Sequence, residues 1–234
     1  MIIKKRDVLQ HFYNNVYSKY LYSGGAQQRG TAWASKLLEK QFSVSQVDYT
    51  LEIGGGSGEH LRFVRTAPHL SYYSLDIRKP EIEISKVDGS DKLKKVLSFV
   101  VGDAESIPFE DLTMDRVSGT CVFYHLNDPF QALQEIRRVA KNEAEIVFVL
   151  PTDPGILNRF VKKTITFRKL RKLSDYPPEL FYALDHQNHI GSLIQMFEFV
   201  FRNDKIEIKY FPLRFKSWNF NMLVTLKAIK KEYV

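Results

Sequence analysis

Residues 51–60, which read Leu-Glu-Ile-Gly-Gly-Gly-Ser-Gly-Glu-His, are the segment whose composition points most directly to chemistry. A short apolar strand is expected at 49–53, and it runs straight into a cluster of glycines. Glycine permits tight turns with positive φ and lets a ligand approach the backbone closely. A helix that begins near Glu59 would offer free N–H groups and a favourable dipole to an anion. The pattern predicts a ligand-binding turn between a strand and a helix.

The spacing of these glycines separates two classes of nucleotide-binding enzyme. The dinucleotide pattern G-x-G-x-x-G would need glycine at position 59 if it began at Gly54, but Glu59 stands there. If the pattern began at Gly55, it would need glycine where Ser57 stands. The sequence instead reads Glu-x-Gly-x-Gly-x-Gly from Glu52. A nicotinamide-dependent enzyme is therefore the weaker alternative.

Carboxylates follow the next two predicted strands. The strand expected at 70–75 ends at Asp76, and a carboxylate at such a position accepts hydrogen bonds from both hydroxyls of a ribose. The strand expected at 97–101 is followed by a glycine and Asp103. The carboxyl ends of parallel strands meet at one edge of a sheet, where ligands bind. Asp76 therefore extends the predicted ligand site, and Asp103 follows the next strand at the same edge.

Together these segments resemble the class I S-adenosylmethionine-dependent methyltransferases, in particular their small-molecule, type 11-like branch. The glycine spacing is similar to the family's first motif, and residues 102–109 are similar to its adenine-contacting segment. Residues 115–129 resemble the fourth-strand motif, and residues 135–141 resemble the segment before the fifth strand. The resemblance covers about 48–151. It departs from the family at 142–145, where a proline and paired glycines are usual.

The resemblance implies an enzyme with S-adenosylmethionine as cofactor and S-adenosylhomocysteine as product. Methyl transfer is an in-line displacement on carbon, so the protein mainly brings donor and acceptor together. The residues expected to contact the cofactor are Tyr22, Glu52, Gly54, Gly56, Gly58, Asp76, Ile77, Asp103, Ala104, Glu105 and Cys121.

Histidines are the candidates for the acceptor side, because methylation of a hydroxyl also needs a general base. His125 follows the strand predicted at 116–123, and ligands of open α/β sheets bind beyond the carboxyl ends of the strands. The alternative is a structural role, in which His125 caps a helix that begins near Asn127. Both roles stay open at this point.

A second histidine pair lies in the segment Asp185-His186-Gln-Asn-His189. On a helix, His186 and His189 would share one face and, with Asp185, would orient and deprotonate a hydroxyl. Otherwise they are surface residues at a loop-to-helix boundary. A metal site is less favoured, because no further Cys or His cluster supplies ligands, and we expect no metal.

The formal net charge of +7 favours anionic partners without choosing among them. Residues 159–172 form a basic amphipathic pattern, which either packs on its own domain, lies on an anionic membrane surface or holds a phosphorylated substrate. The segment 127–130, Asn-Asp-Pro-Phe, lacks the second proline of the nucleic-acid amino-methyltransferase motif. No RNA-binding module is visible, so nucleic acid is not the expected partner.

Alternating strands and helices in the middle of the chain predict a parallel sheet with helices on both faces. Strand-like segments at 206–211 and 222–228 are joined by a segment too short for a crossover helix. They should form a hairpin that places one antiparallel strand in the sheet. The predicted fold class is therefore α/β, a Rossmann-like, seven-stranded and mostly parallel sheet with a helix at 130–140.

The 234 residues suffice for one α/β domain and are too few for two. No apolar run is long enough to span a bilayer, no secretory signal is visible, and Cys121 is the only cysteine. We therefore expect a cytoplasmic protein. We expect one domain in four parts, which are an N-terminal helical cap at 1–47, a cofactor-binding core at 48–151, a helical acceptor cap at 152–204 and a strand hairpin at 205–234.

The predicted activity is O-methylation of a small-molecule, sugar or lipid-linked acceptor. The pattern Asp185-His-x-x-His, followed by 210–215 and 219–221, looks similar to methyltransferases of bacterial surface-glycan biosynthesis, which favours a sugar. The alternatives are an RNA methyltransferase and a protein that binds the cofactor without turnover. The sequence makes no prediction of oligomeric state.

Overall fold

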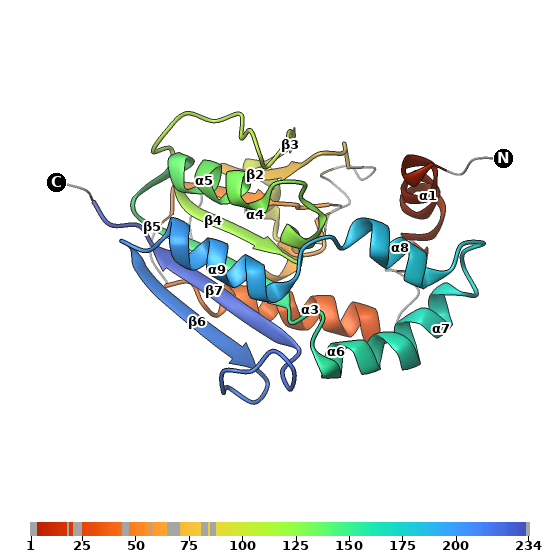
Figure 1. Ribbon diagram of the computed structural model, residues 1–234. Coiled ribbons are helices and arrows are strands. Elements are labelled where there is room, and N and C mark those ends of the chain that lie inside the picture. Colours follow the sequence, from red (N-terminus) through yellow and green to blue (C-terminus); the bar gives the residue numbers. More distant parts are fainter. Residues whose placement is uncertain are drawn as a thin grey trace.

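A single sheet organises the chain (Figure 1). The computed structural model describes residues 4–17, 19–20, 25–43, 47–56, 58–64, 71–80, 84 and 88–232. Over this part of the chain, a seven-stranded sheet has the order β3-β2-β1-β4-β5-β7-β6. Its strands are β1 Tyr49–Ile53, β2 Ser71–Asp76, β3 Leu97–Val101, β4 Met114–Thr120, β5 Ala140–Pro151, β6 Lys205–Phe211 and β7 Leu223–Ile229.

The predicted fold class is confirmed, including the antiparallel strand. Strands β1 to β5 pair in parallel, whereas β7 lies antiparallel between β5 and β6. Residues 212–222 join β6 to β7 and are too short for a crossover, so the two strands pair as a hairpin. The fourth strand ends earlier than predicted, because Cys121 has a φ of 59° and leaves the extended conformation.

Helices surround the sheet, and η marks turns of 3-10 or π geometry. The predicted helix at 130–140 is confirmed as α5, and Asp128 caps it by accepting a hydrogen bond from the Gln131 N–H. Asp128 and not His125 is therefore the capping residue. The helical elements are α1 Lys5–His11, η1 Phe12–Tyr17, α3 Ala26–Glu39, η2 Leu61–Phe63, α4 Asp91–Val96, η4 Phe123–His125, α5 Pro129–Val139, α6 Ile156–Val161, η5 Lys162–Thr166, α7 Phe167–Leu170, α8 Pro178–Asp185 and α9 Ile190–Val200.

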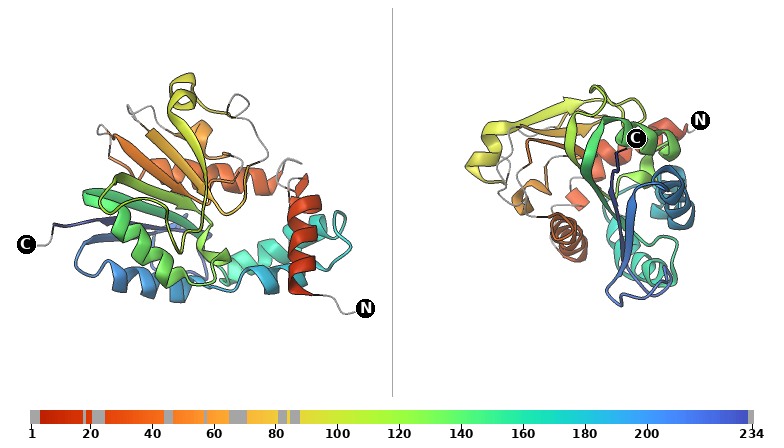
Figure 2. Two further views of the ribbon diagram at one scale, coloured as in Figure 1. Left: turned by 90° about the horizontal axis from the view of Figure 1, so that it is seen from above. Right: turned by 90° about the vertical axis from the view of Figure 1, so that its left-hand side faces the viewer.

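Strand β5 shows how the two layers are built. Because side chains of a strand alternate between faces, Ile146 and Phe148 belong to the core cluster that includes α5 and α9. Val147 and Val149 point the other way and pack with residues of α3. The views in Figure 2 show α3 on one side of the sheet and α5 and α9 on the other. The predicted helices on both faces are confirmed.

The N-terminal helices and the helices of 156–185 meet beyond the carboxyl ends of the parallel strands (Figure 1). The rings of Phe12 and Phe181 stack with centroids 3.4 Å apart. Val16, Tyr20 and Leu170 complete their buried cluster. These segments therefore form a wall above the sheet edge at which ligands of open α/β sheets bind.

One predicted helix is missing from the described residues. The glycine turn was expected to open a helix near Glu59, but the chain forms only the short η2 turn. Here the chain is tied to the interior by His60, which is buried between two carboxylates. Among the described residues, no helix has both the length and the apolar character needed to span a membrane.

Candidate active site

The glycine turn between β1 and η2 has the positive φ values that its composition predicts. Gly54, Gly56 and Gly58 have φ values of 68°, 53° and 80°, a region that favours glycine. The N–H groups of Gly54 and Gly55 donate to the Leu75 carbonyl at 2.8 and 3.2 Å. The turn therefore lies directly against the end of β2.

The Asp76 carboxylate, predicted to hold a ribose, lies at the end of β2 beside the glycine turn. Its Oδ2 accepts a hydrogen bond from the Gly56 N–H at 3.1 Å, and its Oδ1 accepts one from the Arg78 N–H at 3.0 Å. An ionised carboxylate has about four acceptor positions, so two are left for ribose hydroxyls. The turn and Asp76 thus fit the nucleoside part of S-adenosylmethionine. Ile77, which follows, is 68% exposed and lines the same cavity.

The loop after β3 supplies the predicted adenine side of the site. Asp103 is exposed at the cavity, and its Oδ1 accepts a hydrogen bond from the Glu105 N–H at 2.9 Å. Ala104 is buried beside it. The Glu105 side chain accepts from the N–H groups of Asn127 and Asp128, both at 2.8 Å. Glu105 therefore fixes the loop to the start of α5, whereas the Asp103 side chain is exposed at the cavity.

Glu52 has buried partners that sequence reasoning missed. Its Oε1 lies 3.1 Å from Nδ1 of His60, and its Oε2 accepts from the Tyr72 hydroxyl at 3.1 Å. The other ring nitrogen of His60 lies 3.1 Å from Oε1 of Glu39. Burial by itself lowers the pKa of His60, but the two carboxylates outweigh it and raise that pKa to about 9. Glu52 therefore anchors the chain just after the glycine turn through a charged histidine.

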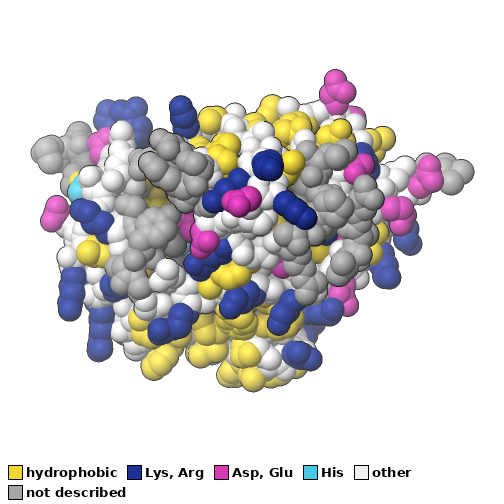
Figure 3. Space-filling view, turned by 180° about the vertical axis from the view of Figure 1, so that it is seen from behind, with side chains coloured by type: hydrophobic (Ala, Val, Ile, Leu, Met, Phe, Trp, Pro, Cys, Tyr) yellow, Lys and Arg dark blue, Asp and Glu magenta, His cyan; other side chains and the backbone are white. Residues whose placement is uncertain are grey.

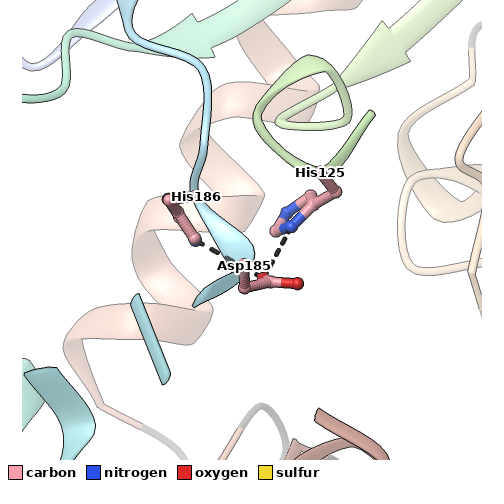
Figure 4. A group of neighbouring side chains, drawn as sticks. All are labelled: His125, Asp185 and His186. Atoms are coloured by element: carbon pink, nitrogen blue, oxygen red, sulfur yellow. Dashed lines mark ion pairs between the residues drawn. The ribbon is translucent and has the colours of Figure 1, made fainter. Parts of the chain in front are cut away.

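On the acceptor side, His125 pairs with Asp185. Nδ1 of His125 lies 2.7 Å from Oδ2 of Asp185, and the Tyr13 hydroxyl lies 2.9 Å from both carboxylate oxygens. Burial by itself raises the pKa of Asp185, but the hydrogen bonds with His125 and Tyr13 hold it below its usual range. Figure 4 shows His125 reaching toward Asp185 from the turn after β4. Tyr13 is a site residue that the sequence analysis missed.

His186 lies beside this pair, deeper in the wall. Its Nε2 is 3.9 Å from Oδ2 of Asp185, and its Nδ1 is 3.8 Å from Oδ2 of Asp153. Asp153 in turn forms an ion pair with Lys162. Burial and the nearby Lys162 lower the pKa of His186, which favours the neutral ring. Asp153 and Lys162 were also missed by the sequence analysis.

His189 does not join the site. The predicted shared helical face of His186 and His189 is wrong, because α8 ends at Asp185 and residues 186–189 are irregular. His189 is exposed at the start of α9 and contacts Ser192 at 3.1 Å. It does not line the cavity that holds His186.

Three possible metal ligands come together at His125, Asp185 and His186. A metal site was less favoured from the sequence because further ligands were lacking, but one ligand atom of each of these residues lies within 4.8 Å of the others. Asp185 is, however, already engaged by His125 and by Tyr13. The cluster therefore has the arrangement of a hydrogen-bonded base, in which the carboxylate orients an imidazole.

One cavity of about 1210 Å³ joins the cofactor side to the acceptor side. Ligand pockets are commonly about 300–1,000 Å³, so this volume is large enough for a donor and an acceptor together. Cys121 lines it at the end of β4, and burial raises the pKa of its thiol to about 11. Tyr22, the remaining predicted contact, lies outside the described residues. Aromatic side chains from the N-terminal helices and α8 also line the cavity, namely Phe12, Tyr13, Tyr17, Tyr20, Phe181 and Tyr182.

Known proteins share the sequence pattern. Residues 51–148 match the methyltransferase domain family. Demethylmenaquinone methyltransferase of Thermotoga maritima is 31% identical over 138 residues, which are 58% of this chain and 57% of that protein. Ubiquinone/menaquinone biosynthesis C-methyltransferase UbiE of a Ruegeria species is 26% identical over 158 residues, 64% of this chain and 63% of that protein. The chain thus spans less than two thirds of these relatives' length.

Solved structures share the fold. The plantazolicin methyltransferase BpumL, in complex with S-adenosylhomocysteine, has a TM-score of 0.64 at 14% identity and covers 97% of this chain and 95% of its own. The N-methyltransferase NodS of Bradyrhizobium japonicum, also with S-adenosylhomocysteine, has a TM-score of 0.61 at 12% identity and covers 98% and 100%. Residues 51–148 are therefore similar to the methyltransferase domain family, and the chain shares the fold of these methyltransferases.

Proposed function

We propose that this protein transfers a methyl group from S-adenosylmethionine to the hydroxyl oxygen of a small aromatic acceptor. The pairing of His125 with Asp185 carries the proposal, because both residues line the cavity that also contains Gly54 and Asp76. When bound, S-adenosylmethionine supplies an electrophilic methyl group. The chain's own residues must then position the acceptor and remove its proton.

His125 is the proposed general base. A carboxylate only accepts hydrogen bonds, so the hydrogen between His125 and Asp185 belongs to Nδ1. That tautomer leaves Nε2 with a lone pair, and Nε2 has no hydrogen bond to the described part of the chain. An acceptor hydroxyl bound there would give its proton to Nε2, and the Asp185 carboxylate would stabilise the resulting imidazolium. Asp185 and Tyr13 are positioning residues in this scheme.

The cavity wall favours an aromatic acceptor over a sugar. Tyr13, Tyr17 and Tyr182 line the cavity, together with the apolar Phe181. Aromatic rings pack well against one another in offset or edge-to-face arrangements. A sugar would need many hydrogen-bond partners in the same space. An aromatic alcohol therefore fits this wall better than the sugar that the C-terminal sequence pattern suggested.

Methylation of a ring carbon is the second candidate, and the relatives favour it. One of them is named as a C-methyltransferase of ubiquinone and menaquinone biosynthesis. Removal of a phenolic proton places negative charge on the oxygen and on the neighbouring ring carbons. The same base, His125, would therefore serve either outcome.

Product analysis tests the proposal. The full chain is incubated with S-adenosylmethionine carrying an isotope-labelled methyl group and with phenols, hydroquinones, their methyl ethers, sugars and RNA. We expect label on phenols and hydroquinones but not on the matched ethers, which lack the proton that His125 removes. Magnetic resonance then separates a methoxy product from a methyl group on carbon. Methyl transfer to sugars or RNA alone would contradict the proposal of an aromatic acceptor. Cofactor binding without methyl transfer to any of these compounds would contradict the proposal that the protein is an enzyme.

A further inference from the structure

Exposed apolar side chains gather on α6 and on the loop between β6 and β7, residues 212–222. They are between 44% and 65% exposed, although all are large. In Figure 3 hydrophobic side chains collect along the lower edge of the molecule, where these segments lie, with Lys and Arg around them. We call this surface the apolar patch, and its residues are Ile156, Phe160, Leu213, Phe215, Trp218 and Phe220.

The loop that carries most of the patch is firmly built. Buried Asn221 accepts a hydrogen bond from the Leu213 N–H at 2.8 Å and donates to the carbonyls of Phe215 and Ser217 at 3.0 and 2.8 Å. The Leu157 N–H donates to the Asn219 carbonyl at 3.0 Å, which ties α6 to the loop. The patch is therefore a fixed surface formed by two segments.

The charge around the patch has one sign. Residues 154–174 contain seven Lys and Arg and no Asp or Glu, and residues 212–222 contain Arg214 and Lys216 and no acid. Arg159 and Lys163 are exposed beside Phe160. None of these four cations makes an ion pair with a described residue. Their charge is thus available to a partner.

We propose that the apolar patch docks the protein on the surface of an anionic lipid bilayer. Trp and Phe side chains are favourable at the level of the lipid headgroups, and exposed Lys and Arg are attracted to anionic lipids. The cores of protein–protein interfaces are instead depleted in Lys. From the sequence, such contact was one of three alternatives, and only for residues 159–172. The structure adds the loop 212–222, which contributes most of the aromatic side chains.

The patch and the cavity lie on opposite sides of one segment. Val161, Lys162 and Ile165 of α6 and η5 line the cavity, whereas Ile156 and Phe160 face outward. A protein docked on a bilayer through α6 would hold its acceptor side close to the lipid. The acceptor is then an aromatic alcohol that dissolves in membranes. This last step rests on the proposed function, whereas docking itself does not.

Vesicle sedimentation of the purified full chain tests the docking. The probes are phosphatidylcholine vesicles with and without phosphatidylglycerol. We expect binding only to the anionic vesicles, weakened by salt because the charges are exposed. The double variant Phe160→Ser/Phe215→Ser should bind at least about tenfold more weakly. Each substitution removes the favourable free energy of moving an aromatic ring from water into the lipid. The triple variant Arg159→Gln/Lys163→Gln/Lys216→Gln should also lose binding.

Matched variants keep the test specific. Phe199→Ser removes a ring that is 56% exposed on α9, outside the patch, and Lys92→Gln/Lys95→Gln removes exposed charge from α4. Both should bind like the unmodified chain. Equal loss in the charge variants of the patch and of α4 would show that net charge alone acts, and equal loss in Phe199→Ser would show that the position of the ring does not matter. Either result would overturn the proposal. So would absence of binding to anionic vesicles, or a patch variant that only converts a dimer to a monomer.

The two proposals fail separately. Vesicle binding needs no methyl transfer, so its loss leaves the proposed reaction untouched. Conversely, the patch variants should methylate a water-soluble phenol at the normal rate, because Phe160 and Phe215 do not line the cavity.

Discussion

Nδ1 of His125 lies 2.7 Å from a carboxylate oxygen of Asp185, although one residue follows β4 and the other ends α8. Tyr13 from the N-terminal helices holds the same carboxylate. The sheet edge, the α8 region and the N-terminus therefore meet at one proton-accepting group. The position and orientation of His125 therefore depend on how α8 and the N-terminal helices pack over the sheet edge.

The first prediction concerns the charge of Asp185. Asp185→Asn keeps the shape but removes the carboxylate that stabilises a protonated His125. We expect kcat to fall on the order of 100-fold, a usual size for a general base that loses its support. Cofactor affinity, measured by calorimetry, should change less than about twofold, because Asp76 and the glycine turn are not touched.

Tyr13→Phe is the matched control for this prediction. It removes one donor to Asp185 but leaves the charge and the His125 contact in place. We expect a smaller loss of kcat than for Asp185→Asn. An Asp185→Asn enzyme with unchanged kcat would show that His125 needs no carboxylate, and would remove the pair from the reaction.

The second prediction separates a base from a metal centre. His125, Asp185 and His186 have ligand atoms close enough for a metal ion. Because Asp185 is already engaged by His125 and Tyr13, we expect turnover to survive dialysis against EDTA. Loss of turnover that added Zn²⁺ restores, with a metal detected in the untreated protein by elemental analysis, would assign the cluster to a metal instead.

The third prediction concerns Asp76. Asp76→Ala removes the predicted acceptor of the ribose hydroxyls and also frees the Gly56 and Arg78 N–H groups. We expect at least about a tenfold loss of cofactor affinity, because each unpaired group costs free energy. Titration calorimetry with S-adenosylhomocysteine measures it. Asp91→Asn, an exposed carboxylate on α4, should bind normally. Unchanged affinity in Asp76→Ala with an intact fold would exclude Asp76 from the site.

The cofactor side was predictable from the sequence because its signals are local. Gly54 and Gly56 follow β1 and Asp76 ends β2, so their order in the chain fixes their place at one edge of the parallel sheet. The helix expected near Glu59 is replaced by the short turn η2, beside which His60 contacts Glu39 and Glu52. The glycine spacing contains no information on these contacts.

The acceptor side was predictable only in parts. His125 and Asp185 were each singled out, but their contact depends on where α8 packs, and periodicity carries no information on that. Tyr13 was missed for the same reason. His189 was misplaced because the helix ends at Asp185 rather than continuing. The spacing of His186 and His189 predicts a shared face only if both residues lie in one helix, and the sequence does not fix where a helix ends.

The fourth prediction tests the close packing of the glycine turn. A Cβ atom on Gly55 would lie 1.9 Å from Oγ of Ser74 and 3.1 Å from its Cβ. Gly55→Ala should therefore displace the turn and lower cofactor affinity by about tenfold or more. Ser74 Oγ is buried and has no hydrogen bond in the described part of the chain, so Ser74→Ala alone should be harmless.

The double variant Gly55→Ala/Ser74→Ala checks this cause. It removes the closer of the two contacts and leaves the one at 3.1 Å. Calorimetry should find an affinity between those of Gly55→Ala and the unmodified chain. A double variant no better than Gly55→Ala would mean that backbone freedom at Gly55, and not contact with Ser74, controls binding.

The last prediction concerns the buried histidine between Glu39 and Glu52. Its pKa is raised from 6.5 to about 9 in the folded protein, because the carboxylates outweigh burial. A raised pKa stabilises the fold fully below pH 6.5, and the contribution disappears as the pH rises through about 9. The free energy of unfolding should therefore fall by roughly 3 kcal/mol across this window. Urea unfolding at a series of pH values measures it.

The variant His60→Gln isolates this effect, since glutamine has no charge to lose. We expect it to be less stable than the unmodified chain by roughly 3–5 kcal/mol near pH 6.5, because two buried carboxylates lose their cation. The difference between the two proteins should shrink as the pH approaches 9. His189→Gln replaces an exposed histidine and keeps His60. The difference in unfolding free energy between this variant and the unmodified chain should therefore be the same at every pH. A constant difference between His60→Gln and the unmodified chain across the window would show that the histidine is neutral and stabilises the glycine turn by hydrogen bonds alone.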